Sequence, residues 1–318
     1  MASDLGNRLL AVAQGSGDAG RVLEAHHALW ATLGAMGESA AALPHLEQGL
    51  ALYDPERHGS QAFLYGGHDA GVCCRYHLAT TRWVLGYPDA ALPPIRDART
   101  LAEKLAHPMT LTITLGYAAW VYYLRGDRAM AREAAERMIA LTTAHSFAGW
   151  IDDGGVVLAC LDVEESGDPR RLSEIYESII SRRGRTAWRN VTCLTRLAGA
   201  FAMVGDVEHG LAALAVIPEA HQSTIYAPEI ERVRGALLLK SGQADEAQRC
   251  FVRAIEIARQ RSERSLELRA ATSLARLLTA HGKRDEARAT LEPVYRWFTE
   301  GFDTADLKEA RALLDALA

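Results

Sequence analysis

Residues 242–254, Gly-Gln-Ala-Asp-Glu-Ala-Gln-Arg-Cys-Phe-Val-Arg-Ala, contain the unit that decides the fold of this chain. Gly242 marks a turn after one helix, and the following residues form a second helix. On that helix Ala247, Phe251 and Ala254 stand at i, i+4 and i+7, which is a single stripe at 3.6 residues per turn. The small residues let a neighbouring helix approach closely, and the phenylalanine fills the space between. The stretch therefore predicts a helix–turn–helix pair with one packing face.

The same unit recurs along the chain. Turn glycines stand at Gly37, Gly86, Gly126, Gly167, Gly205, Gly242 and Gly282, with a first interval of 49 residues and then intervals of 40, 41, 38, 37 and 40. The fifth residue after each glycine is mostly small: Ala42, Ala91, Ala131, Leu172, Gly210, Ala247 and Ala287. The ninth is mostly large: Leu46, Ile95, Ala135, Tyr176, Leu214, Phe251 and Leu291. A small residue followed one turn later by a large one is what helix-on-helix packing requires.

This periodicity predicts an all-α protein, a right-handed α-α superhelix of about seven tetratricopeptide-like repeats. We expect one domain over residues 1–318, with a long extended loop at 54–68, a shortened repeat and connection at 206–225 and a capping helix at 303–318. Helices are predicted near 4–14, 19–36, 39–53, 69–85, 88–105, 108–125, 127–144, 147–165, 168–182, 187–204, 206–216, 224–241, 243–261, 264–281, 283–299 and 304–317. Pro88, Pro108 and Pro169 suit first-turn positions, and Gly-Asp at 126–127, 167–168 and 205–206 supplies a helix stop and then an acidic N-cap.

Composition narrows the class of partner. Hydrophobic residues make up 49% of the chain, enough for a continuous core, and the net charge of -5 is spread along it. With no basic field to hold a polyanion, we expect no nucleic-acid partner. The apolar runs are shorter than the roughly 20 residues of a membrane span, so we expect no membrane contact. Five cysteines and no signal-peptide pattern favour reduced thiols in the cytoplasm.

Residues 265–276 and 295–307, together with 45–58 and 83–92, resemble the C-terminal tetratricopeptide-like region of large bacterial signalling proteins. In those proteins a class III nucleotide cyclase or a transcription-regulator domain is joined to an AAA/STAND-type ATPase. The resemblance implies a sensor or protein-interaction arm. The cyclase metal aspartates and the ATP-binding Gly-x-x-x-x-Gly-Lys-Ser/Thr loop do not occur in this sequence, so we predict no enzyme activity.

The first helix presents Leu5, Leu9, Leu10 and Val12, which suit packing against a preceding unit. This pattern indicates either a fragment of a longer array or a chain that pairs at this end. The oligomeric state therefore stays open.

The first candidate binding site is a glycine-rich loop that enters a helix, with polar residues on both sides: Tyr65, His68, Asp69, Arg75 and His77. Such a loop exposes backbone N–H groups at the positive end of the helix dipole, which suits an anion or a polar ligand. Cys73 and His77, four residues apart, share a helix face as a zinc pair would. The alternative is that Asp69 caps the helix and that Cys73 and Cys74 are small core residues. We predict no metal and no cofactor.

Other candidates lie on the first helices of successive pairs, which line the concave wall of such a solenoid. Asp152 and Asp153 follow Trp150 at a helix start, where the dipole favours acids or where they could contact a ligand. Trp188 and Arg189 belong to a cluster that includes Arg182, Arg183 and Arg185, which could clamp a carboxylate or a phosphate or form a solvated basic loop. The aromatic residues chosen for the groove are Tyr117, Trp150, Trp188 and Tyr226.

Three functions remain open. The first is a non-catalytic scaffold whose concave groove binds a protein or peptide segment, including its own upstream cyclase or ATPase domains. The second is a small-molecule sensor with a pocket closed by residues 58–77. The third is an enzyme that uses the groove.

Overall fold

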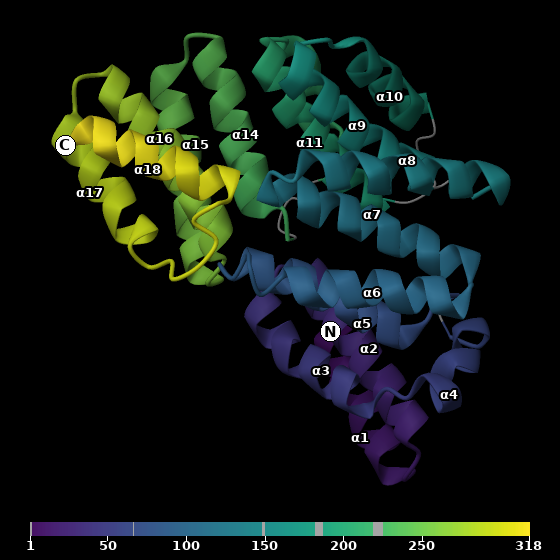
Figure 1. The fold of residues 1–318 in the computed structure, drawn as a ribbon. Coiled ribbons are helices and arrows are strands. Elements are labelled where there is room, and N and C mark those ends of the chain that lie inside the picture. Colours follow the sequence, from purple (N-terminus) through teal and green to yellow (C-terminus); the bar gives the residue numbers. More distant parts are fainter. Residues whose placement is uncertain (1, 66, 148–149, 182–186, 219–224) are drawn as a thin grey trace.

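The computed structural model describes residues 2–65, 67–147, 150–181, 187–218 and 225–318, without the side chains of 151 and 187–190. Over these residues the chain forms seventeen α-helices and one short 3-10 helix, and no strand. The prediction of an all-α repeat solenoid is confirmed (Figure 1).

The helices follow one another as antiparallel pairs, each packed on the next. In chain order they are α1 (Ala2–Gly15), α2 (Ala19–Ala35), α3 (Ser39–Leu52), α4 (Pro55–His58), η1 (Gly59–Phe63), α5 (Ala70–Val84), α6 (Leu92–Leu105), α7 (Pro108–Arg125), α8 (Arg128–Ala144), α9 (Ile151–Ser166), α10 (Arg170–Ser181), α11 (Ala187–Val204), α12 (Val207–Ala215), α14 (Ala227–Lys240), α15 (Ala244–Gln260), α16 (Arg264–Ala280), α17 (Arg284–Tyr295) and α18 (Ala305–Leu317).

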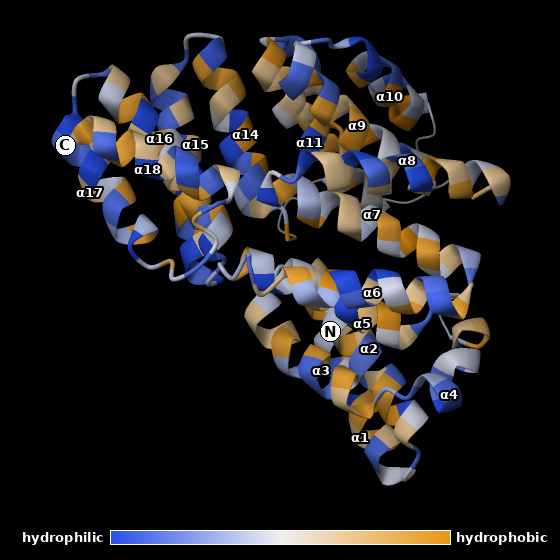
Figure 2. Ribbon diagram, viewed as in Figure 1, coloured by the Kyte–Doolittle hydropathy of each residue, from blue (hydrophilic) through white to orange (hydrophobic). Residues whose placement is uncertain are grey.

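The repeat unit behaves as its sequence predicts. All seven turn glycines have a positive φ, from 69° to 97°, the left-handed conformation that ends a helix. Every residue at the two stripe positions is buried, the fifth after each glycine and the ninth alike. Asp127 and Asp206 cap the helices that follow their glycines by accepting from the Met130 and His209 N–H groups. The helices carry apolar and polar faces side by side (Figure 2).

Several predicted boundaries are wrong. The helix predicted from 147 begins at Ile151, and the helix predicted to end at 299 ends at Tyr295. Residues 54–68, expected to form an extended loop, contain α4 and η1, because Asp54 caps α4 and Pro55 stands at its first position. The helix expected from 88 begins at Leu92. The N–H groups of Asp89 and Ala90 donate instead to the Glu300 carboxylate, at 2.8 and 2.9 Å.

The superhelix curls until its two halves touch. Helix α16 packs on α5 and α18 packs on α7, and the loop between α17 and α18 lies beside the turn before α6 (Figure 1). The Ser265 Oγ donates to the Trp83 carbonyl at 2.5 Å, and the Gly301 N–H donates to Asp89 Oδ2 at 2.8 Å. Arg125 bridges Asp89 and Asp303 across the same junction. We call these contacts the closure seam. These contacts close the superhelix around its concave face.

Candidate functional sites

The concave face encloses a cavity of about 720 Å³. The first helices of successive pairs line it, namely α5, α7, α9, α11, α14 and α16, together with α18. This is the wall that the sequence predicts for partner binding. Its lining begins at Thr80, so the cavity is not the pocket expected to be closed by residues 58–77.

A cation–aromatic cluster lies on one side of this groove. The Arg196 guanidinium stacks on the Trp120 indole, with Cζ 3.2 Å from the ring centroid, and lies 5.5 Å from the Tyr226 ring. Its Nη2 donates to the Tyr226 hydroxyl at 3.2 Å. Arg196 Nη1 and Trp120 Nε1 are buried and have no hydrogen-bond partner among the described residues. The cluster therefore holds two buried N–H donors that lack an acceptor.

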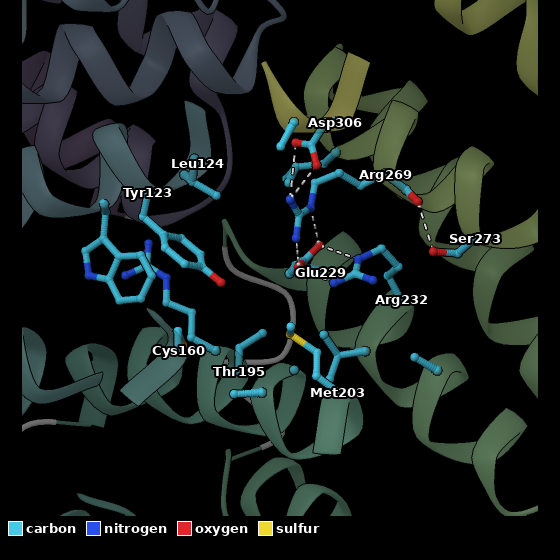
Figure 3. A pocket seen from close by; sticks show the side chains of 18 of the residues that line it. Tyr123, Leu124, Cys160, Thr195, Met203, Glu229, Arg232, Arg269, Ser273 and Asp306 are labelled. Atoms are coloured by element: carbon cyan, nitrogen blue, oxygen red, sulfur yellow. Dashed lines mark hydrogen bonds and ion pairs between the residues drawn. The ribbon is translucent and has the colours of Figure 1, made fainter. Parts of the chain in front are cut away.

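Alternating charges form another part of the groove wall (Figure 3). Glu229 accepts from Arg232 at 2.6 Å and from Arg269 at 3.0 Å, and Arg269 also donates to Asp306 at 2.9 Å. Burial alone would raise the pKa of Glu229, but the two guanidinium groups hold that pKa well below its usual value. Helices α14, α16 and α18 are thereby tied together at the groove.

A second polar set lies beside the first. The Tyr123 hydroxyl donates to Glu164 at 2.6 Å, and Arg128 pairs with the same carboxylate at 2.9 Å. Burial raises the pKa of the neighbouring Cys160 thiol to about 12, which keeps the thiol protonated at neutral pH. Cys160 is therefore a poor nucleophile.

Of the four aromatic residues chosen from sequence for the groove, Tyr226 lines it. Tyr117 instead stacks on Tyr76, with centroids 4.2 Å apart, and Trp150 packs against the core at the start of α9. The side chains of Trp188 and Arg189 lie outside the described residues, as do Arg182, Arg183 and Arg185.

Neither Arg196 nor Trp120 is among the residues that the sequence predicts for the groove. Trp120 stands one turn after Tyr117 on α7, so helical spacing alone could not separate the two.

Asp152 and Asp153 stand in the first turn of α9 as expected, and neither belongs to the groove lining. Asp152 accepts from the Ser178 hydroxyl at 3.1 Å, and Asp153 accepts from the Cys193 thiol at 3.5 Å. The Asp152 bond reaches α10 within the same helix pair, and the Asp153 bond reaches α11 of the next pair, so these carboxylates contribute to packing within and between repeats.

The glycine-rich loop supports the capping interpretation of Asp69. This residue is 1% exposed, and its carboxylate accepts from the Val72 N–H and from the Tyr53 hydroxyl, both at 2.8 Å. Tyr65 is exposed, and Arg75 donates back to the Gly71 carbonyl. These contacts fix the loop and the start of α5.

A cluster of imidazoles and one thiol, which we call the His–Cys cluster, lies beside this loop: His27, His68 and Cys73. Cys74 points elsewhere and donates to the Leu46 carbonyl. His77, which shares a helix face with Cys73 as a partner in a zinc pair would, has its Nε2 3.5 Å from the Tyr117 hydroxyl. The residue that joins Cys73 is instead His27 of α2, which is too distant in sequence for any spacing rule to find.

Electrostatics couple the members of this cluster. Burial would raise the pKa of the Cys73 thiol, but His27 and His77, with hydrogen bonds from His27 and His68, hold that pKa well below its usual value. Burial would lower the pKa of His27, but Cys73 and Glu24 outweigh it and raise that pKa to about 10. Thiolate and imidazolium therefore stabilise each other.

Among the described helices, none combines the length and the apolar character needed to cross a membrane.

Comparison with known proteins supports the repeat assignment. Residues 226–296 match the tetratricopeptide repeat family. The chain is also similar to an uncharacterized protein of Rhizobium meliloti (strain 1021), 26% identical over 272 residues, which cover 80% of this chain. It spans 25% of the length of that relative. This chain therefore contains a tetratricopeptide-repeat region, carried by helices α14 to α17.

Proposed function

We propose that this chain is a non-catalytic interaction module whose concave groove binds a protein segment through a carboxylate. The segment presents that carboxylate as an Asp or Glu side chain or as its free C-terminus. Tetratricopeptide repeats generally serve as protein-interaction scaffolds, which supports the general class of function.

The proposal rests on the absence of a carboxylate partner for Arg196 among the described residues. Each other arginine of the groove lining pairs with a carboxylate of the described residues: Arg128 with Glu164, Arg232 and Arg269 with Glu229, and Arg276 with Glu309. Arg196 has no such pair in the described part of the chain, and Trp120 holds its guanidinium flat at the groove. A planar guanidinium with a free edge binds carboxylates by charge-assisted hydrogen bonds.

The aromatic partners strengthen this interpretation. Trp120 and Tyr226 shield the Arg196 guanidinium from water, which makes a charge-assisted bond stronger than at an exposed site. Trp120 is 5% exposed and its Nε1 has no acceptor among the described residues, so one ligand could satisfy both donors.

The module would act as the sensor or docking arm of a larger signalling protein in the bacterial cytoplasm. The resemblance to such arms supports this context. So does the similarity to a relative in which the aligned part makes up a quarter of the length. The bound segment would belong to a cyclase, ATPase or regulator domain of the same protein.

The test is a selection from a displayed library of peptides with free C-termini, followed by affinity measurement by fluorescence anisotropy. We expect acidic residues to be enriched, and we expect Arg196→Met to weaken binding roughly 10- to 100-fold because one charge-assisted contact is lost. Methionine preserves the apolar stem over Trp120. C-terminal amides and Asp→Asn versions of each selected peptide identify the carboxylate that binds.

The matched control is Arg253→Met on the exposed face of α15, away from the groove, which should leave affinity unchanged. Equal affinity for the native chain and Arg196→Met, or full affinity for peptides in which every carboxylate has been replaced by an amide, would refute the proposal.

A small-molecule carboxylate is the second candidate, and the cavity volume favours it. The value of about 720 Å³ lies within the ~300–1,000 Å³ typical of ligand pockets. A thermal-shift screen of carboxylate metabolites on the native chain and on Arg196→Met decides between the two. A stabilising metabolite whose effect disappears in the variant would favour the sensor. If no metabolite stabilises the chain and an acidic peptide binds, the docking arm is favoured.

A further inference from the structure

We propose that the His–Cys cluster is a transition-metal site, with His27, His68 and Cys73 as the protein ligands of a zinc ion. The site is separate from the concave groove, since none of the three residues belongs to the groove lining. It also departs from the sequence-based expectation of no metal.

Geometry is the first support. The three candidate ligand atoms, two imidazole nitrogens and one sulfur, all lie within 4.8 Å of one another. In a tetrahedral zinc site with bonds of about 2.0–2.3 Å, ligand atoms stand roughly 3.3–3.8 Å apart. The His27 and His68 rings already meet edge to face, 5.1 Å between centroids. Small side-chain rotations would therefore bring the three atoms to bonding distance.

The surroundings of His27 are the second support. Its Nδ1 bonds to Glu24 Oε2 at 2.9 Å, and its ring stacks on Trp30 with centroids 5.0 Å apart. A carboxylate on one ring nitrogen fixes the tautomer and turns the other nitrogen to the metal, as in carboxylate–histidine–zinc arrangements. Glu24 and His27 are three residues apart on α2, so this orientation is built into one helix turn.

The backbone around the other two ligands is also fixed. Asp69 separates His68 from α5, and its N–H donates to Thr110 Oγ1 at 3.0 Å on the neighbouring helix α7. Two residues later Gly71 lies against the Tyr53 ring, where a Cβ would come within 2.4 Å. His68 and Cys73 are thereby held at the entry of α5, five residues apart, opposite His27. A pre-organised site loses less entropy on binding.

The ligand set narrows the choice of metal to the borderline and softer transition metals. One thiolate and two imidazoles form a borderline-soft set, which suits Zn²⁺ and disfavours Mg²⁺ and Ca²⁺. Three protein ligands leave a fourth position for water or an exogenous donor. A metal here would cross-link α2 to α5 and so join the first repeat to the second.

The experiment uses the full chain, stripped with chelator and titrated with Zn²⁺ against a chromogenic chelator. We expect about one equivalent to bind, with affinity reduced at least tenfold in His68→Gln, His27→Gln and Cys73→Ser. Substitution by Co²⁺ should give a thiolate-to-cobalt charge-transfer band that Cys73→Ser abolishes. Zn²⁺ should raise the Tm of the native chain by ~5 °C and leave that of Cys73→Ser unchanged.

Two matched controls keep the result specific. His45→Gln removes a histidine of α3 that contacts His26 rather than the cluster, and Cys250→Ser removes a thiol of α15. Both should bind Zn²⁺ as the native chain does. If Cys73→Ser fails to fold, His68→Gln at the edge of the cluster decides, with folding checked by circular dichroism. Less than a tenth of an equivalent in the native chain, or full affinity in a folded His68→Gln variant, would overturn the proposal.

Discussion

Glu263, the residue before α16, is fully buried, and neither of its carboxylate oxygens has a hydrogen-bond partner among the described residues. Burial raises its pKa to about 8, against an ordinary value of 4.5, and Arg261 only partly offsets this. Ser265, two residues later, makes the closure-seam bond to Trp83. At the residue scale this carboxyl is therefore a destabilising element beside the junction of the two halves.

The sign of its effect on stability follows from the raised pKa. The folded chain binds the proton more tightly than the unfolded chain, so the contribution of Glu263 is fully present below pH 4.5 and is lost as pH rises to 8. We expect Glu263→Gln to raise the free energy of unfolding by ~2–4 kcal/mol at pH 8.5 and to change it little at pH 4.5. Urea unfolding followed by circular dichroism at the two pH values measures this. A variant that follows the native pH dependence would show that Glu263 is charged without cost.

The ion pairs of the groove wall also act at this scale. Arg269 sits between Glu229 and Asp306, so its removal leaves the partly buried Asp306 without its cation and Glu229 with Arg232 alone. We expect Arg269→Met to lower the free energy of unfolding by ~2–4 kcal/mol, because breaking a buried pair costs more than the pair contributes. Arg288→Met, whose Glu292 partner lies on the same helix and on the surface, is the control and should cost less than ~0.5 kcal/mol. Equal losses in the two variants would contradict the structural role of Arg269.

At the element scale, the turn glycine is what lets each helix pair close. Gly242 has φ of +82° with nothing near the position of a Cβ, so a substitution there meets only the backbone penalty of the left-handed region. Gly34 near the end of α2 also has open space, but its backbone lacks the positive φ. Crowding is absent at both positions, so their comparison isolates the effect of the left-handed backbone conformation.

We therefore expect glycine-to-alanine substitution to change the free energy of unfolding in opposite directions at the two positions. Gly242→Ala should lower the free energy of unfolding by ~1–2 kcal/mol, and Gly34→Ala should raise it by ~0.5–1 kcal/mol, because alanine is the better helix former. Thermal and denaturant unfolding of both variants measures the difference. A neutral Gly242→Ala would mean that the turn adopts another conformation without cost.

At the scale of the whole molecule, the closure seam determines the shape of the groove. Glu300 caps the turn before α6, and Asp89 accepts from both Gly301 and Arg125. The bonds made by Glu300 and Gly301 join residues more than 200 positions apart, which no local preference dictates. Because they draw α16 and α18 toward α5 and α7, the cavity depends on them.

Opening the seam should loosen the molecule without unfolding its helices. In the double variant Asp89→Ala, Glu300→Ala we expect faster amide hydrogen exchange at 83–91 and 297–304, a larger radius of gyration in solution scattering and an unchanged far-ultraviolet spectrum. Glu292→Ala, which breaks only ion pairs within one helix, is the control. Exchange rates equal to those of the native chain would show that apolar contacts alone hold the two halves together.

The sequence by itself determined the repeats of this protein. Turn glycines such as Gly242 and buried stripes such as Ala247 and Phe251 are local signals, because helix periodicity and left-handed turns act within a dozen residues. The tertiary structure alone decided the sites. His27 meets Cys73, and Arg196 meets Trp120, only because stacked repeats bring together residues 46 and 76 positions apart. The packing of neighbouring repeats sets those distances, and that packing has no short-range sequence signature.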